Sequence, residues 1–163
     1  MIKSAADLLL QIKETMGESW LPRIYRERIL KMRTRSYEFP ALPKHAAPQI
    51  EHTLLGIELK VGRRRMLCPD LATARYLAVF ARIGCQTIAI PYDITKLSQI
   101  ADELESSWHR MFLIADSVAA SGSSAFRGRL ERVLRDSVRD EIGEAGAGTR
   151  IPQFRQTTKQ RNR

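Results

Sequence analysis

Glu58 and Lys60 are the residues whose types and spacing best suit chemistry on a phosphate group. Residues 53–61 are strand-like, because Ile57, Leu59 and Val61 alternate with this pair, which predicts a half-buried strand. Side chains two positions apart on a strand point to the same face. A carboxylate there can hold Mg²⁺ or Mn²⁺ through oxygen, and a neighbouring lysine can orient a water or stabilise a charged phosphorane. The pair is therefore the first candidate catalytic site.

The elements expected around this pair follow a recognisable order. An E-x-K strand is followed by a basic turn, a helix over 70–83, an apolar strand over 85–90 and a helix rich in Leu and Glu. Over residues 57–104 this order resembles the PD-(D/E)XK nucleases, notably the Holliday-junction resolvases and the virus-type replication-repair nucleases. The resemblance implies a metal-dependent phosphodiester hydrolase, or a nuclease-like core that has lost catalysis, with Glu58 and Lys60 as the catalytic residues.

The resemblance also implies a second metal-binding acid upstream of the E-x-K strand, usually an Asp. No Asp occurs between positions 7 and 70, so Glu51 is the nearest candidate to join Glu58 in holding Mg²⁺ or Mn²⁺. On one straight strand the two would lie about 23 Å apart, so Glu51 can serve only if a turn near Leu55-Gly56 folds the chain back. Glu38 is an alternative further upstream. Otherwise Glu58 and Lys60 form the polar face of an ordinary strand.

The chain is strongly basic, with 27 Lys and Arg against 18 Asp and Glu and a net charge of +9. This bias indicates a polyanionic partner such as DNA or RNA. The excess lies in residues 23–35, in the run 63–65 and in the C-terminal tail. The residues expected to contact phosphate are Arg23, Arg26, Arg28, Lys31, Arg63, Arg64, Arg65, Arg155, Lys159 and Arg161. The alternatives are a solvated helix face for the first segment and a solvated terminus for the tail.

The expected fold is α/β, in a single domain over residues 1–142 followed by a disordered basic tail over 143–163. A helical N-terminal part covers 1–50, with helices over 4–16 and 22–35 and then an irregular, proline-containing connector. A small sheet with a crossover helix covers 51–92. An antiparallel helical hairpin covers 93–142.

The hairpin is expected from a very regular apolar pattern. Spacings of four and three alternate through Leu97, Ala101, Leu104, Trp108, Met111, Ala115 and Val118, as in a coiled-coil seam. An SGSS turn and a second amphipathic helix follow. This pattern supports an alternative function, a non-enzymatic assembly protein that forms homo-oligomers through the hairpin. Residues 100–111 also resemble a helix-turn-helix, which would make the chain a DNA-binding regulator, but Glu105 at the turn and the acidic character of 93–105 favour one continuous helix.

Composition argues against several other classes. The apolar runs are far shorter than the roughly 20 residues that cross a bilayer, and no signal peptide is visible, so a cytoplasmic protein without membrane partners is expected. Two cysteines, Cys68 and Cys85, indicate a reducing compartment. Three scattered histidines without a CxxC motif argue against a zinc site.

Overall fold

The computed structural model describes residues 3–40, 42 and 47–148. Its elements are α1 (Ala5–Met16), the 3-10 turn η1 (Gly17–Ser19), α2 (Leu21–Ile24), the π-helical turn η2 (Tyr25–Ile29), β1 (Thr34–Glu38), β2 (Gln49–Thr53), β3 (Gly56–Val61), β4 (Arg64–Cys68), α3 (Leu71–Ile83), β5 (Thr87–Pro91), the 3-10 turn η3 (Ile94–Lys96), α4 (Leu97–Val118) and α5 (Ser124–Ala145). This mixture of helices and strands confirms the α/β class. Within the described ranges, no helix combines the length and apolar character that crossing a membrane requires.

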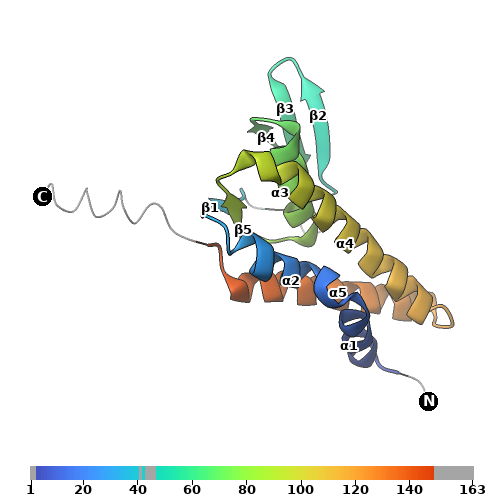
Figure 1. Ribbon diagram of the computed structural model, residues 1–163. Coiled ribbons are helices and arrows are strands. Elements are labelled where there is room, and N and C mark those ends of the chain that lie inside the picture. Colours follow the sequence, from blue (N-terminus) through green and yellow to red (C-terminus); the bar gives the residue numbers. More distant parts are fainter. Residues whose placement is uncertain (1–2, 41, 43–46, 149–163) are drawn as a thin grey trace, which may run out of the picture.

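The five strands form two separate antiparallel sheets. β2, β3 and β4 make a three-stranded meander in that order, whereas β1 pairs with β5. One face of the meander packs on α3 and buries Leu59 and Val61. The chain leaves α3 for β5, so the expected crossover helix connects one sheet to the other (Figure 1). The apolar strand after the helix therefore pairs with β1 and not with the E-x-K strand.

The N-terminal helix lies where the sequence predicts it. The Ser4 hydroxyl accepts a hydrogen bond from the Asp7 amide, and the Asp7 carboxylate accepts one from the Ser4 amide, a reciprocal capping box. The predicted second helix over 22–35 is wrong over its last six residues, because η2 ends at Ile29 and β1 begins at Thr34. Backbone pairing with β5 holds this segment extended, so the expected irregular connector also contains strands at both its ends.

Tyr25 connects the N-terminal part to the end of the last helix. Its ring is fully buried, and its hydroxyl accepts a hydrogen bond from the Ala89 amide and donates one to the Gly146 carbonyl. Burial raises the pKa of this hydroxyl to about 12. α5 itself reaches Ala145, three residues into the range predicted to be a disordered tail. That prediction is wrong at its start, and most of the tail, from residue 149, lies outside the described residues.

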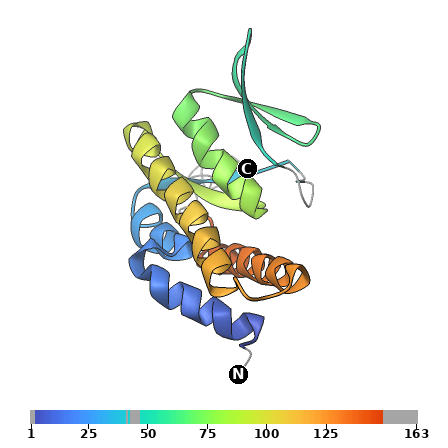
Figure 2. The same ribbon diagram turned by 90° about the vertical axis from the view of Figure 1, so that its right-hand side faces the viewer.

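The regular apolar pattern forms one continuous helix, α4, which passes through positions 105–107 without a break. The continuous-helix interpretation is confirmed. The turn that a helix-turn-helix requires is absent from positions 105–107. α4 packs mainly against α3, whereas α5 packs mainly against α1. Figures 1 and 2 show that α4 and α5 meet at their connecting turn and diverge from it. The seam of α4 is buried within the chain as far as Ala115, and association of copies through the hairpin stays a prediction.

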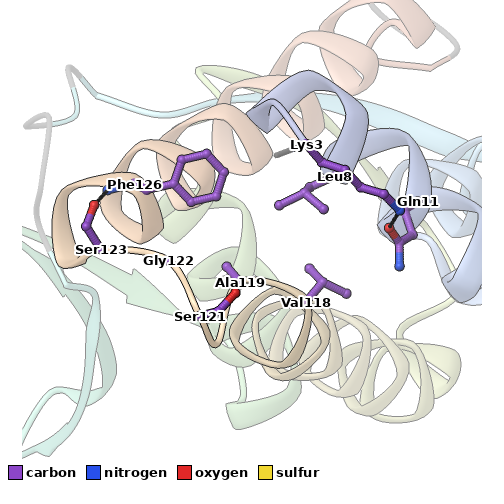
Figure 3. A pocket seen from close by; sticks show the side chains of 9 residues that line it. All are labelled: Lys3, Leu8, Gln11, Val118, Ala119, Ser121, Gly122, Ser123 and Phe126. Carbon is purple, nitrogen blue, oxygen red and sulfur yellow. Dashed lines mark hydrogen bonds between the residues drawn. The ribbon is translucent and has the colours of Figure 1, made fainter. Parts of the chain in front are cut away.

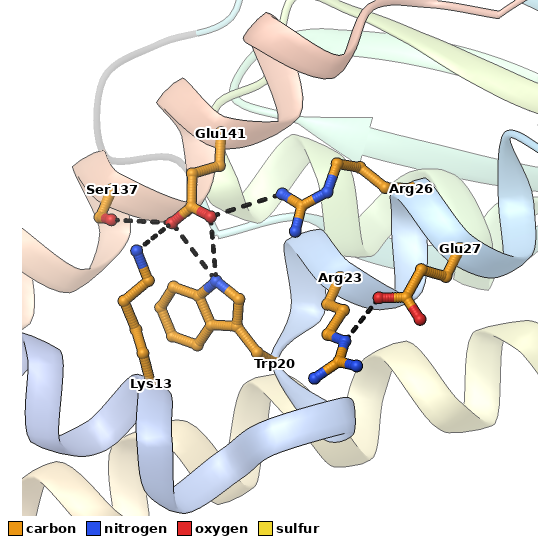
Figure 4. Close-up of polar contacts among 7 residues, drawn as sticks. All are labelled: Lys13, Trp20, Arg23, Arg26, Glu27, Ser137 and Glu141. Atoms are coloured by element: carbon orange, nitrogen blue, oxygen red, sulfur yellow. Dashed lines mark hydrogen bonds and ion pairs between the residues drawn. The ribbon is translucent and has the colours of Figure 1, made fainter.

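Glu141 joins α5 to the N-terminal helices (Figure 4). Its carboxylate lies 3.0 Å from Lys13 Nζ, 3.2 Å from Trp20 Nε1 and 3.6 Å from Arg26 Nη1. Burial alone raises the pKa of this carboxyl, but the hydrogen bonds from Lys13 and Trp20 outweigh burial and leave the pKa below its ordinary value. The carboxylate therefore stabilises the fold in its ionised form.

Acidification should remove this contribution. A carboxyl whose pKa is lowered by folding stabilises the protein above its unfolded pKa, and the benefit disappears as pH falls through the lower folded value. Replacing Glu141 with Ala should cost roughly 1.5–3 kcal/mol at neutral pH, the usual range for hydrogen bonds to a charged group. Urea unfolding at several pH values should show that wild type loses more stability on acidification than Glu141→Gln. Glu144→Gln, an exposed acid on the same helix, is the matched control, and parallel pH profiles for wild type and Glu141→Gln would contradict the assignment.

Candidate functional site

A tight turn brings Glu51 and Glu58 together. The chain reverses at Leu54 and Leu55, between β2 and β3, so the two acids are direct partners in the antiparallel register. The predicted condition for Glu51 to join Glu58, a turn near Leu55-Gly56, is therefore met. Glu38 lies in β1, which belongs to the other sheet.

These acids lie on the face of the meander opposite α3. Leu59 and Val61 face the helix, so the alternation of β3 sends Glu58 and Lys60 to the other side, where Lys60 is the register partner of Arg65 on β4. No other described helix packs extensively on that side. Neighbouring side chains nonetheless leave Glu58 only 8% exposed. Glu51, Glu58 and Arg65 therefore form a polar network on the face of the sheet that α3 does not cover.

Arg65 holds the two carboxylates. Its Nη1 lies 3.0 Å from Glu51 Oε2 and 3.2 Å from Glu58 Oε1, and these hydrogen bonds raise the pKa of the guanidinium above its ordinary value. Like charges opposite each other on adjacent strands repel, so the pair needs a cation, and Arg65 supplies it.

The residues at this site fit an ion-pair network better than a metal site. A divalent ion between the two carboxylates would compete with Arg65, which already holds one oxygen of each. Nowhere in the described part of the chain do three His, Cys, Asp or Glu side chains gather in a way that could hold a metal ion. Binding of Mg²⁺ or Mn²⁺ by Glu51 and Glu58, and the catalytic roles of Glu58 and Lys60, stay predictions.

Three of the six cations in the first basic segment, residues 23–35, pair with acids of the same chain. Arg23 pairs with Glu27 one helical turn later (Figure 4). Arg26 and Arg28 pair with acids of α5 and α4. Lys31 is exposed and forms no ion pair with a described residue. Three of the four residues predicted here to contact phosphate therefore have structural partners.

The arginine run presents two side chains to solvent. Gly62 adopts a φ of 63°, a left-handed conformation that suits glycine, and so closes the tight turn between β3 and β4. Arg63 and Arg64 are exposed at this turn without an ion pair to any residue in the described ranges, whereas Arg65 is held by the acid pair. The predicted tail residues Arg155, Lys159 and Arg161 lie outside the described residues.

The structure adds a basic surface that was not predicted. Residues 124–135 contain four arginines and one acid, and we call Arg127, Arg129, Arg132 and Arg135 the α5 arginine ridge. The last three are spaced three apart, so they follow one side of the helix. None of the four pairs with an acid among the described residues, and the buried Nε of Arg135 has no hydrogen-bond partner there. Averaging charge over residues 85–142, where the net is −2, hides this local excess.

The ridge begins where the dipole of its own helix disfavours positive charge. The first turn of α5 contains no acid, and Arg127 lies at the end of that turn, where the partial positive charge of a helix N-terminus disfavours a cation. α1 shows the favourable arrangement, with Asp7 in its first turn and Lys13 in its last. Helix stability therefore does not explain the α5 arginines.

Comparison with known proteins gives no relative for this chain. No protein-family model matches it, and neither a curated protein nor a solved structure does. The resemblance of residues 57–104 to PD-(D/E)XK nucleases accordingly stays a prediction, and the function has to be inferred from the chemistry of these surfaces.

Proposed function

We propose that this protein binds nucleic acid through phosphate contacts from the α5 arginine ridge and from Arg63 and Arg64, without cleaving it. The observation that carries the proposal is the ridge, whose four arginines form no ion pair with an acid among the described residues. Arginine suits phosphate because its planar guanidinium donates two parallel hydrogen bonds to the phosphate oxygens.

The length of the ridge favours a polyanion over a single small anion. Arg129 and Arg135, the ends of the row that follows one side of α5, are six residues apart, about 9 Å along a helix. Duplex DNA carries one phosphate charge per roughly 1.7 Å of its axis, so several phosphates of one polymer lie within reach of such a row. A single phosphate ion would engage only one or two of these side chains.

Paired and unpaired arginines provide a matched test of this proposal. Arg63→Gln combined with Arg64→Gln should weaken binding to a labelled duplex about tenfold per arginine, because a hydrogen bond to a charged group contributes about 1.5–3 kcal/mol. The control removes the same charge from Arg23 and Arg139, which already pair with Glu27 and Asp136. Fluorescence anisotropy at low salt should show a much smaller effect for the control. Equal losses would mean that net charge alone determines binding.

The acid pair gives a separate prediction about cleavage. Because Arg65 already pairs with both Glu51 and Glu58, we expect no nicking of plasmid or branched DNA by wild type with added Mg²⁺ or Mn²⁺. Glu58→Gln is the decisive comparison. Metal-dependent cleavage that this substitution abolishes would establish a nuclease and overturn the binding-only proposal, whereas cleavage that survives it would come from a contaminant or from another site.

A further inference from the structure

The two residues of the β2–β3 turn are leucines, and no described residue covers them. Leu54 is 107% exposed and Leu55 is 78% exposed, and Leu67 on β4 is 64% exposed. Leu67 lies beside the turn, since its Cδ1 is 3.6 Å from the position that a Cβ on Gly56 would take. Turn positions ordinarily hold Gly, Asn, Asp, Pro or Ser, so forming the turn does not require leucine. We call Leu54, Leu55 and Leu67 the leucine tip.

An apolar pocket lies where α1, α4 and α5 come together (Figure 3). Leu8, Val118, Ala119 and Phe126 line it, and its volume is about 620 Å³. Polar side chains border the apolar lining, with Lys3 Nζ donating a hydrogen bond to Gln11 Oε1. Gly122 leaves room for the aromatic ring, because a Cβ there would come within 2.9 Å of Phe126 Cδ2.

The β2–β3 turn, which carries the leucine tip, and the α4–α5 turn, which borders the pocket, lie at opposite ends of the molecule (Figures 1 and 2). The pocket includes the last residue of α4, whereas the β2–β3 hairpin projects beyond the other end of that helix. The 22 residues of α4 span about 33 Å. The tip therefore cannot reach the pocket of its own chain.

We propose that the leucine tip of one copy inserts into the pocket of a second copy, so that copies associate head to tail. Both halves of the contact are present in one chain, as a narrow apolar projection and an apolar hollow with a polar border. Exposed apolar clusters of this kind mark interaction surfaces. Such a contact joins two different surfaces, so it leaves one tip and one pocket free and extends into a chain or closes into a ring.

Each half of the contact can be disabled separately in the full chain. Without nucleic acid, the mass of wild type measured by analytical ultracentrifugation should rise with concentration. Leu54→Asp with Leu55→Asp should weaken association about tenfold to a hundredfold per leucine, since burying a leucine contributes about 1.5–3 kcal/mol. Ser121→Trp should block the pocket mouth from an exposed position, and Val118→Glu should place a charge inside it. Leu113→Asp changes an exposed leucine of α4 that lines neither surface and should associate like wild type.

Mixing the tip variant with the pocket variant tests whether the copies associate head to tail. The tip variant keeps an intact pocket and the Ser121→Trp variant keeps an intact tip, so together they should form a one-to-one dimer and nothing larger. Dimer formation also shows that both variants are folded. The proposal is overturned if wild type stays monomeric at every concentration, if the mixture stays monomeric, or if Leu113→Asp abolishes association. A mixture that remains monomeric while wild type associates would indicate contact between like surfaces.

Discussion

Replacing Trp108 with Ala should lower the free energy of unfolding by about 3–5 kcal/mol, the usual cost of deleting a buried aromatic ring. Trp108 is 7% exposed, and its ring packs edge-on against Phe112 with centroids 4.9 Å apart. It lies in the seam of α4, which packs against α1, α2, α3 and α5. Removing the ring leaves a cavity that a helix packed on several sides cannot close.

Urea denaturation measures this cost directly, and Trp20 keeps a fluorescent reporter in the variant. The neighbouring residue provides the control, because His109 is exposed and its replacement by Ala should change stability by no more than about 0.5 kcal/mol. A loss below about 1 kcal/mol for Trp108→Ala would contradict burial of the ring in the core.

Reversing the charge of Arg127, Arg129 and Arg132 to Glu should lower the affinity for duplex DNA by about a thousandfold or more. The estimate allows about tenfold for each lost phosphate contact, and the new carboxylates add repulsion. All three side chains are exposed, so the fold should tolerate the change, which circular dichroism and unfolding would check.

The control for this variant carries the same change in net charge. Arg82, Lys96 and Arg110 are exposed cations outside the ridge, and reversing all three to Glu should reduce affinity far less, because salt screens charges beyond roughly 10 Å at 0.1 M. Equal losses in the two triple variants would show that the ridge is not the binding surface.

Locally encoded features were predictable from the sequence. The Ser4–Asp7 capping box, the Asp70 cap of α3 with Gly84 after its end, and the uninterrupted period of α4 all depend on residues close together in the chain. Helix signals of this kind need no tertiary partner. β1 was missed because residues 34–38 become a strand only by pairing with β5, about fifty residues later, and strand formation depends on such context.

The candidate site was only partly predictable for the same reason. Glu58 and Lys60 were found from strand alternation, and Glu51 joined them only because a turn with leucines at its centre reverses the chain. Ion pairs such as Arg26 with Glu141 join residues more than a hundred positions apart. Counting charges along the sequence therefore selected arginines that are already engaged, and averaging over a long segment hid those of α5.

Binding of the full-length wild-type chain to duplex and single-stranded DNA at two salt concentrations tests the central claim most directly. Each phosphate contacted on a duplex should contribute a slope of roughly 0.9 log units of affinity per log unit of salt. On a duplex, we expect a slope of about 4 to 5 from five contacts alone, those of Arg63, Arg64, Arg127, Arg129 and Arg132. The slope should be shallower for single strands. It should also be smaller in the charge-reversed ridge variant. Absence of binding to either polymer at low salt, or binding that does not change with salt, would contradict the account.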